Sequence, residues 1–183
     1  MDIEVKEKKI SIGDQFDILI DGQQTYAAVS QLFRLLAVVD LFKVDDTRPR
    51  LTVNKLWYWW EPKYDISTYD NNVLQFRTIS VWKNHYQCQR GPDLFDIYGH
   101  TGRKFSVYKN DEQIAWWDKN AVAIFNGNTY SITADRDCDQ ELIIAFCLII
   151  HDCSHDDDNA AVSIDLGNVG PEDKKFDAAW RAK

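Results

Sequence analysis

An almost wholly apolar run near the C-terminus constrains the fold more than any other feature of this 183-residue chain. Every residue from Leu142 to Ile150 is apolar, so a helix formed by this run would need burial on all sides. The run is only about half of the roughly twenty residues that a membrane-spanning helix requires. The sequence therefore predicts a helix that is enclosed by the rest of the protein.

A buried β-strand is the alternative for this run, because isoleucine is frequent in strands. The length of the segment and its acidic start favour a helix over residues 139–153. Asp137, followed three residues later by Gln140, resembles a capping box. Carboxylates at Asp139 and Glu141 also suit the positive end of a helix dipole.

The chain before this run is built of short amphipathic segments separated by turn residues. The clearest is a hairpin around Asn126 and Gly127, a pair suited to the positive backbone angles of a tight turn. Regular short strands over about 125 residues predict a mainly β domain, either a barrel or a sandwich.

The domain boundaries follow from changes in composition. Residues 1–8 are expected to be an N-terminal leader, residues 9–153 the folded domain, and residues 154–183 an acidic tail. Phe176 and Trp180 lie four residues apart, a spacing that would let the tail dock as a short helix.

Composition and cysteine usage narrow the class of protein. A net charge of −8 argues against a general nucleic-acid binder, which needs a basic face. The N-terminal residues include no apolar run of signal-peptide length, and the four cysteines form no CxxC pair. Reduced thiols and a cytoplasmic location, peripheral to a membrane at most and without a transmembrane segment, are therefore expected.

Four segments together resemble a known family. They are LTVNKLWYWWEPKYDIS (51–67), YGHTGRKFSVYKNDEQIAWW (98–117), NGNTYSIT (126–133) and DQELIIAFCLIIHD (139–152). They resemble the tubby C-terminal-like superfamily and, within it, the LURP-one-related family, with phospholipid scramblases as relatives. The resemblance implies a closed antiparallel β-barrel of about twelve strands around a central hydrophobic C-terminal helix.

No catalytic signature accompanies this pattern. The sequence has neither the glycine pattern of a nucleophile elbow nor a phosphate-cradling loop. We therefore expect a protein that is not an enzyme and that uses no cofactor.

Alternating acids before the helix are the first candidate for metal binding. Asp135, Asp137, Asp139 and Glu141 offer oxygen ligands of the kind that hold calcium, and the resemblance to scramblases implies a calcium loop at this place. Helix capping is the competing explanation. A second candidate is His151-x-Cys153-x-His155, which contains softer ligands but has no second ligand pair.

Basic residues are the candidates for a lipid headgroup site. They lie in two clusters of the sequence: Arg48, Arg50 and Lys55, and then Arg103 and Lys104. The resemblance implies phosphoinositide binding by lysines and arginines on a barrel surface. Scattered surface charges are the competing explanation.

Two aromatic runs form the candidate interaction surface: Trp57, Tyr58, Trp59 and Trp60, and then Trp116 and Trp117. In a strand, successive side chains point to opposite faces, so one ring of each pair would point outward. The outward rings would be covered by the tail, by a partner or by a membrane interface.

The leading functional hypothesis is a non-enzymatic module that responds to phospholipids, such as phosphoinositides, or binds a membrane surface. An alternative is a protein-interaction scaffold that uses the outer tryptophans and the acidic tail. A third, weaker hypothesis is a calcium-dependent scramblase-like activity.

Overall fold

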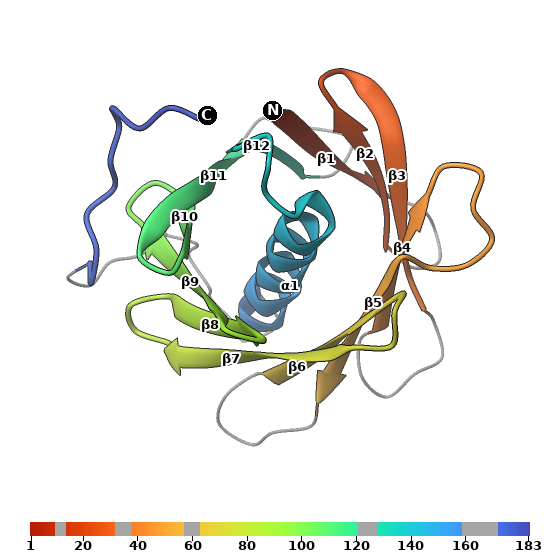
Figure 1. The fold of residues 1–183 in the computed structure, drawn as a ribbon, viewed down its shortest axis with the longest axis horizontal. Helices are drawn as coiled ribbons and strands as arrows, with labels where there is room; N and C mark the ends of the chain where they lie inside the picture. The colour runs from red at the N-terminus through yellow and green to blue at the C-terminus, as the bar shows by residue number, and fades with distance from the viewer. Residues whose placement is uncertain (10–13, 32–37, 57–62, 121–127, 159–171) are drawn as a thin grey trace.

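A computed structural model describes residues 1–9, 14–31, 38–56, 63–120, 128–158 and 172–183. Within these ranges, twelve strands precede one helix (Figure 1). The elements are β1 (Asp2–Lys9), β2 (Asp14–Ile20), β3 (Gln23–Ser30), β4 (Val38–Lys43), β5 (Leu51–Leu56), β6 (Lys63–Thr68), β7 (Val73–Ser80), β8 (His85–Arg90), β9 (Asp93–His100), β10 (Lys104–Lys109), β11 (Glu112–Asn120), β12 (Thr129–Ala134) and α1 (Gln140–Asp158).

The twelve strands form one closed barrel in which each strand pairs with its sequence neighbours. All pairings are antiparallel, and β1 closes the barrel by pairing with β12, with Ile3 opposite Ile132. Closure leaves no sheet edge open. The prediction of a closed, mainly β barrel around a hydrophobic helix is therefore confirmed.

Residues 1–8 are part of the barrel wall, so the prediction of a leader is wrong. Strand β1 spans Asp2–Lys9, and its inward residues Ile3 and Val5 are fully buried. The alternating charges Glu4 and Lys6 belong to the solvated face of the strand. An amphipathic strand and a polar leader have similar compositions, and only the pairing partner distinguishes them.

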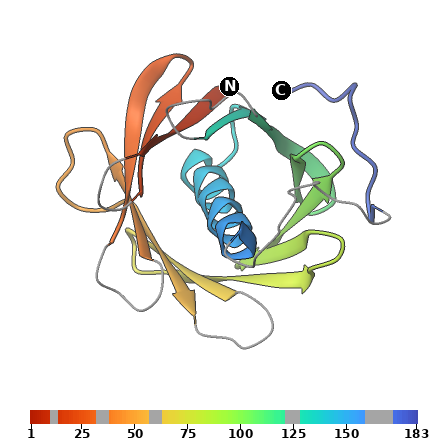
Figure 2. The same cartoon turned by 180° about the vertical axis from the view of Figure 1, so that it is seen from behind.

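Helix α1 runs through the lumen of the barrel, as the two opposite views show (Figures 1 and 2). Each residue from Leu142 to Ile150 is at most 3% exposed. Barrel walls surround the helix, so no side of it needs polar residues. The predicted helix is present and ends later than expected, at Asp158 instead of residue 153.

The helix begins at a different cap from the one predicted. Asp139 accepts a hydrogen bond from the backbone N–H of Leu142 at 3.1 Å, which is the geometry of an N-cap. Asp137 lies two residues further out. Asp139 takes this role because α1 begins at the next residue, Gln140, and its carboxylate also receives a hydrogen bond from Arg90, on the barrel wall.

The predicted tail is partly helix and partly an extended strap. Residues 154–158 belong to α1, whereas residues 172–183 contain no helix and run along the outside of β9–β11 (Figures 1 and 2). The expected short docking helix is therefore wrong for this part of the chain. The hairpin predicted at Asn126 and Gly127 falls outside the described residues.

Two further features bear on the expected class of protein. All four cysteines are reduced thiols that form no disulfide. In the parts of the chain that the structure describes, no helix is long and apolar enough to cross a membrane.

Candidate functional site

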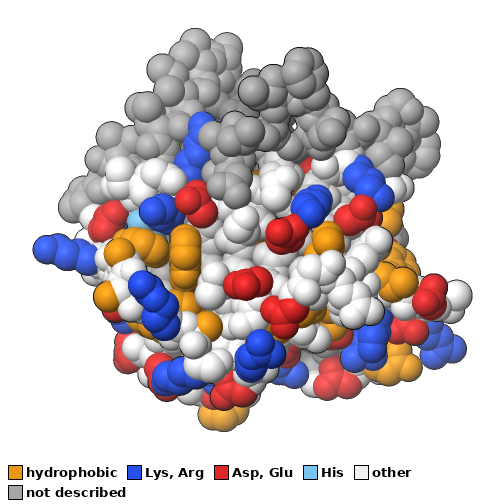
Figure 3. Space-filling model, turned by 90° about the horizontal axis from the view of Figure 1, so that it is seen from above, with side chains coloured by type: hydrophobic (Ala, Val, Ile, Leu, Met, Phe, Trp, Pro, Cys, Tyr) orange, Lys and Arg blue, Asp and Glu red, His pale blue; other side chains and the backbone are white. Residues whose placement is uncertain are grey.

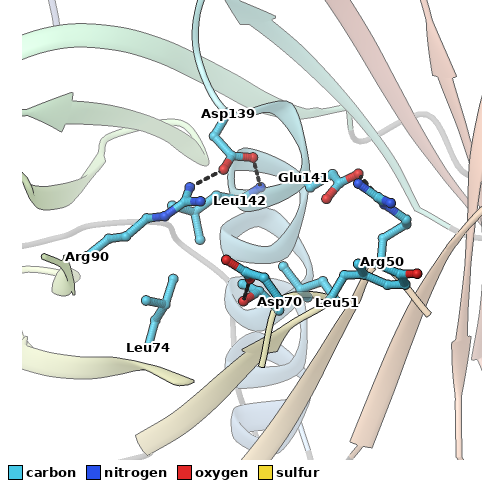
Figure 4. Close-up of a pocket in the computed structure, with 10 residues that line it drawn as sticks. Arg50, Leu51, Asp70, Leu74, Arg90, Asp139, Glu141 and Leu142 are labelled. Atoms are coloured by element: carbon cyan, nitrogen blue, oxygen red, sulfur yellow. Dashed lines mark hydrogen bonds and ion pairs between the residues drawn. The ribbon is translucent and has the colours of Figure 1, made fainter. Parts of the chain in front are cut away.

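One mouth of the barrel holds a pocket of about 280 Å³ beside the first turn of α1. Figure 4 shows Arg50 and Arg90 reaching from opposite sides toward the helix start, above Leu51 and Leu74. The lining residues are Arg50, Leu51, Thr68, Tyr69, Asp70, Leu74, Arg90, Asp139, Glu141 and Leu142. Each arginine stands next to a carboxylate of the helix.

Paired charges dominate this pocket. Arg50 Nε lies 3.0 Å from Glu141 Oε1, and the Arg50 guanidinium lies 5.1 Å from the centre of the Tyr69 ring. The hydrogen bond to Glu141 raises the pKa of Arg50. Arg90 pairs with Asp139. These pairs join the barrel wall to the helix.

Further hydrogen bonds hold the carboxylates of the mouth in place. Tyr26 donates to Glu141 Oε1 at 3.2 Å and accepts from Gln140 Nε2 at 2.9 Å. Burial, with Glu141 nearby, raises the pKa of Tyr26 to about 12. Asp70 accepts from Thr68, and that bond lowers the pKa of the Asp70 carboxyl. Two arginines thus face three carboxylates, so an anionic headgroup would have to displace a carboxylate here.

The four acids proposed for calcium do not form a metal-binding group in the described part of the chain. Asp139 caps the helix, Glu141 pairs with Arg50, and buried Asp135 accepts the backbone N–H of Lys183 at 2.6 Å. Asp135, Asp137 and Asp139 do line one pocket of about 530 Å³, but Arg90 and Lys183 line it as well. Within the described ranges, no group of three or more His, Cys, Asp or Glu residues could hold a metal. Calcium binding stays a prediction without a ligand set.

In the second metal candidate, His151 and Cys153 contact residues of the barrel wall. His151 is buried, its Nδ1 lies 2.6 Å from the Tyr130 hydroxyl, and Phe16 packs edge-on against its ring. Cys153 Sγ lies 3.3 Å from the Tyr64 hydroxyl. The side chain of His155 lies outside the described residues.

The five basic residues proposed for headgroup binding lie at two ends of the barrel. Arg48 and Arg50 lie in the β4–β5 connection, near the start of the helix, whereas Lys55 lies near Asp152, beyond its middle. Arg103 and Lys104 lie at the β9–β10 turn, at this second end. The sequence clusters therefore do not form one site, and headgroup binding by these five residues stays a prediction.

Lys55 belongs to a small polar cluster between the barrel wall and the helix. Lys55 Nζ and the Tyr64 hydroxyl lie 2.9 and 2.8 Å from Asp152 Oδ2. Burial, followed by the neighbouring Cys153 and Asp152, raises the pKa of Tyr64. The cluster satisfies a carboxylate that would otherwise be buried without partners.

Of the two aromatic runs, the structure describes only the second. Trp117 is fully buried in the core and stacks on Phe105 at 5.4 Å, whereas Trp116 points outward and meets the Phe176 ring at 5.3 Å. The predicted alternation and the predicted cover by Phe176 are present here. Trp57, Tyr58, Trp59 and Trp60 lie outside the described residues.

Ser106, His100 and Glu172 stand in the order of a nucleophile, a base and an acid. His100 Nε2 lies 2.6 Å from Ser106 Oγ, and His100 Nδ1 lies 3.6 Å from Glu172 Oε2. However, Ser106 lies within strand β10 and is 1% exposed, so a substrate carbonyl cannot reach its Oγ in this arrangement. The three residues fasten the C-terminal segment to the barrel.

Sequence reasoning missed the large hydrophobic side chain that is most exposed among the described residues. Trp82, in the turn between β7 and β8, is 90% exposed, and its neighbour Val81 is 54% exposed. The signal was available, because the alternation of β7 ends at Ser80 and is followed directly by Val81-Trp82-Lys83-Asn84. On the face shown in Figure 3, by contrast, the described acidic and basic side chains are interspersed without a broad area of one sign.

Comparison with known proteins assigns this barrel to a family. The model of the LURP-one-related family matches residues 1–152, which is most of the chain. The chain belongs to the LURP-one-related family. The match begins at residue 1, in agreement with β1 as a barrel strand, and LURP-one-related membership agrees with a tubby-like barrel. No match was found among curated proteins or among solved structures.

Proposed function

We propose that this LURP-one-related protein is a non-enzymatic module that binds the surface of a membrane through its β7–β8 turn. The observation that carries the proposal is Trp82, which is 90% exposed at the tip of the turn. Tryptophan is enriched at membrane interfaces, where one part of its ring is apolar and another is wet.

The neighbours of Trp82 extend the apolar tip. Val81 and Ile79 are both exposed, so three large apolar side chains lie within four residues. Large apolar side chains exposed this close together in the chain indicate an interaction site. Lys83 follows directly, with its side chain 40% exposed, and supplies a cation at headgroup level.

The base of the turn is held against the neighbouring strand. Asn84 N–H donates to the Val81 carbonyl at 3.2 Å, and Gly99 N–H donates to the Asn84 carbonyl at 2.8 Å. A Cβ atom at Gly99 would lie 2.5 Å from Asn84 Cβ, so glycine is what permits this approach. The turn presents Trp82 from a fixed base, which reduces the entropy lost on binding.

Charge decides which membranes suit this site. The net charge of −8 opposes general attraction to anionic lipid. Lys83 pairs with Asp173, so a phosphate group would compete with that carboxylate. We therefore expect Trp82 to supply most of the affinity, with Lys83 and the β9–β10 turn adding a preference for phosphoinositides. Family membership supports a lipid-binding role of the tubby-like kind.

Vesicle flotation tests the proposal. The protein is mixed with vesicles of phosphatidylcholine alone, with added phosphatidylserine, or with added phosphatidylinositol bisphosphate, each with calcium or a chelator. Trp82→Ala should weaken binding at least tenfold, or about 1.4 kcal/mol. Tyr69→Ala is the matched control, because Tyr69 is an exposed aromatic residue at the opposite mouth.

The outcomes separate the hypotheses. Equal loss in both variants, or no loss in Trp82→Ala, would contradict the assignment to the β7–β8 turn. No flotation with any vesicle would contradict membrane binding and leave Trp82 as a protein contact. Flotation that requires calcium would instead favour the scramblase-like hypothesis.

A further inference from the structure

The outer side of β9, β10 and β11 bears a set of side chains that we name the docking face: His100, Ser106, Tyr108, Gln113 and Trp116. We infer that the docking face is a binding site for an extended peptide segment of a partner protein, and that residues 172–183 occupy it as an intramolecular ligand. The inference does not rest on membrane binding by Trp82, although Asp173 of this segment pairs with Lys83 beside Trp82. Both ribbon views show the C-terminal segment beside these strands (Figures 1 and 2).

The first observation is that polar side chains on the outer face of the barrel wall are buried. Phe105 and Val107 pack toward the core, so Ser106 between them points outward. Outward polar side chains of a barrel are normally solvated. Yet Ser106, His100 and Gln113 are between 1% and 6% exposed. This part of the outer surface is therefore built to be covered.

The covering segment makes regular contacts. Glu172, Lys174 and Phe176 are half-buried, whereas the residues between them, Asp173 and Lys175, are exposed. A period of two is the pattern of an extended segment lying on a surface. The docking face thus receives alternate side chains, as in peptide recognition by an extended strand.

A carboxylate anchors the beginning of the segment. Glu172 Oε1 accepts hydrogen bonds from the backbone N–H and the hydroxyl of Thr101, at 3.0 and 3.3 Å. The next residue, Asp173, pairs with Lys83 and lies 3.8 Å from His85 Nδ1. The docking face therefore selects an acidic residue at this position.

Aromatic rings anchor the middle and the end. Phe176 packs edge-on against His100 and Trp116, each at 5.3 Å, with Lys104 Nζ 5.0 Å from its centre. Trp180 Nε1 donates to the Gln113 carbonyl at 3.2 Å. Lys174 Nζ lies 3.6 Å from the centre of the Tyr108 ring. The matching ligand has an acidic residue at position 1, an aromatic residue at 5 and tryptophan at 9.

Two unsatisfied groups indicate that the segment of this chain is not the best ligand. His100 Nδ1 and Gln113 Nε2 are buried and find no hydrogen-bond partner among the described residues, and Glu172 Oε2 stays 3.6 Å from His100 Nδ1. Buried polar atoms without partners weaken binding. A partner segment with acceptors in reach of both atoms would bind more tightly, whereas the chain's own segment is held by its high effective concentration.

The test measures binding of a labelled synthetic peptide, residues 172–183, to the full-length protein by fluorescence anisotropy. Phe176→Ala releases the intramolecular ligand and should bind the peptide at least tenfold more tightly than the wild type does. Adding Trp116→Ala to that variant should remove the gain. Lys175→Ala is the matched control, because Lys175 is an exposed residue of the same segment, and it should behave as the wild type.

Two more peptides test the recognition pattern. One keeps the acidic residue at 1, phenylalanine at 5 and tryptophan at 9 and changes the rest, and the other has the same composition in scrambled order. The first should bind the Phe176→Ala variant within about threefold of the native peptide, and the second should not bind. Equal binding of the scrambled peptide, or no binding of any peptide, would overturn the inference.

Folding and oligomeric state are checked alongside. If Phe176→Ala fails to fold, Trp180→Ala is used instead to release residues 172–183 from the docking face. Sedimentation of the wild type should show a monomer. A dimer that dissociates in Phe176→Ala would place the segment on a second copy of the chain and would also overturn the inference.

Discussion

Lys55 and Asp152 form an ion pair of 2.9 Å that complements the pair between Arg50 and Glu141 at 3.0 Å. Glu141 and Asp152 are eleven residues apart on α1, or about 16 Å. Arg50, directly before β5, and Lys55 within it are five residues apart, which is also about 16 Å in extended chain. One strand thus holds the helix at two points, and two residues proposed for headgroup binding position the core helix.

We first predict that the two ion pairs, Lys55–Asp152 and Arg50–Glu141, contribute unequally to stability. Lys55→Met should lower the free energy of unfolding by about 1–3 kcal/mol, because it leaves the partly buried Asp152 carboxylate without its cation. Arg50→Ala should cost about 1 kcal/mol or less, because its pair is more exposed. Urea denaturation measures both, with the exposed Lys43→Met as control. A larger loss in Arg50→Ala would contradict the predicted order.

The second prediction concerns the middle of α1. Ile144 is fully buried, so Ile144→Asp would place an isolated charge in the barrel lumen and should prevent folding. Ile144→Val should cost only about 0.5–1.5 kcal/mol. Circular dichroism and thermal melting distinguish them. A cooperative transition of Ile144→Asp near that of the wild type would show that the helix does not fill the lumen.

Third, the two acids before the helix, Asp137 and Asp139, should differ in how much they contribute to stability. Asp139→Ala removes the N-cap and the partner of Arg90, and should cost about 1–2 kcal/mol. Asp137→Ala should change stability by less than about 0.5 kcal/mol. Denaturation gives the difference, and calcium titration calorimetry is run on the same variants. Calcium affinity that disappears in Asp137→Ala would support a metal site in place of a cap.

Fourth, acid should weaken the docked state through His100. Burial lowers the pKa of His100 from its ordinary value of 6.5, and Glu172 opposes this shift only in part. Below about pH 6.5 the unfolded chain therefore binds a proton more readily than the folded protein, so the free energy of unfolding falls as the pH decreases. Denaturation between about pH 5 and 8 should show a shallower slope for His100→Gln than for the wild type. Identical slopes would mean that another group titrates.

Fifth, removal of residues 172–183 should leave a folded barrel, because no strand is lost. The truncation uncovers Trp116, Tyr108 and His100, so binding of a hydrophobic dye and self-association should both increase. Dye fluorescence and sedimentation are the measurements. A truncated protein that stays monomeric and binds no dye would show that the segment covers no apolar surface.

Local patterns were sufficient for most of the fold. The run from Leu142 to Ile150 predicted a helix without a polar side, and alternation predicted that Trp117 would face the core. Each inference concerns burial of a residue relative to its own sequence neighbours, which periodicity records directly. The alternation of buried and exposed residues in β7 also stops just before the exposed Trp82.

Other features depended on the partner that each residue meets in space. Strand β1 was mistaken for a leader, because only its pairing with β12 closes the barrel. Asp139, not Asp137, caps the helix because α1 begins at Gln140. Arg50 and Lys55 position the helix because β5 and the residue before it lie beside Asp152 and Glu141. Ser106 and His100 are buried because a distant segment covers them. Periodic burial is local, so the sequence was enough to predict the central helix and the alternation of the strands. Charge pairing and cover depend on residues up to about a hundred positions away, which only the closed barrel brings into contact.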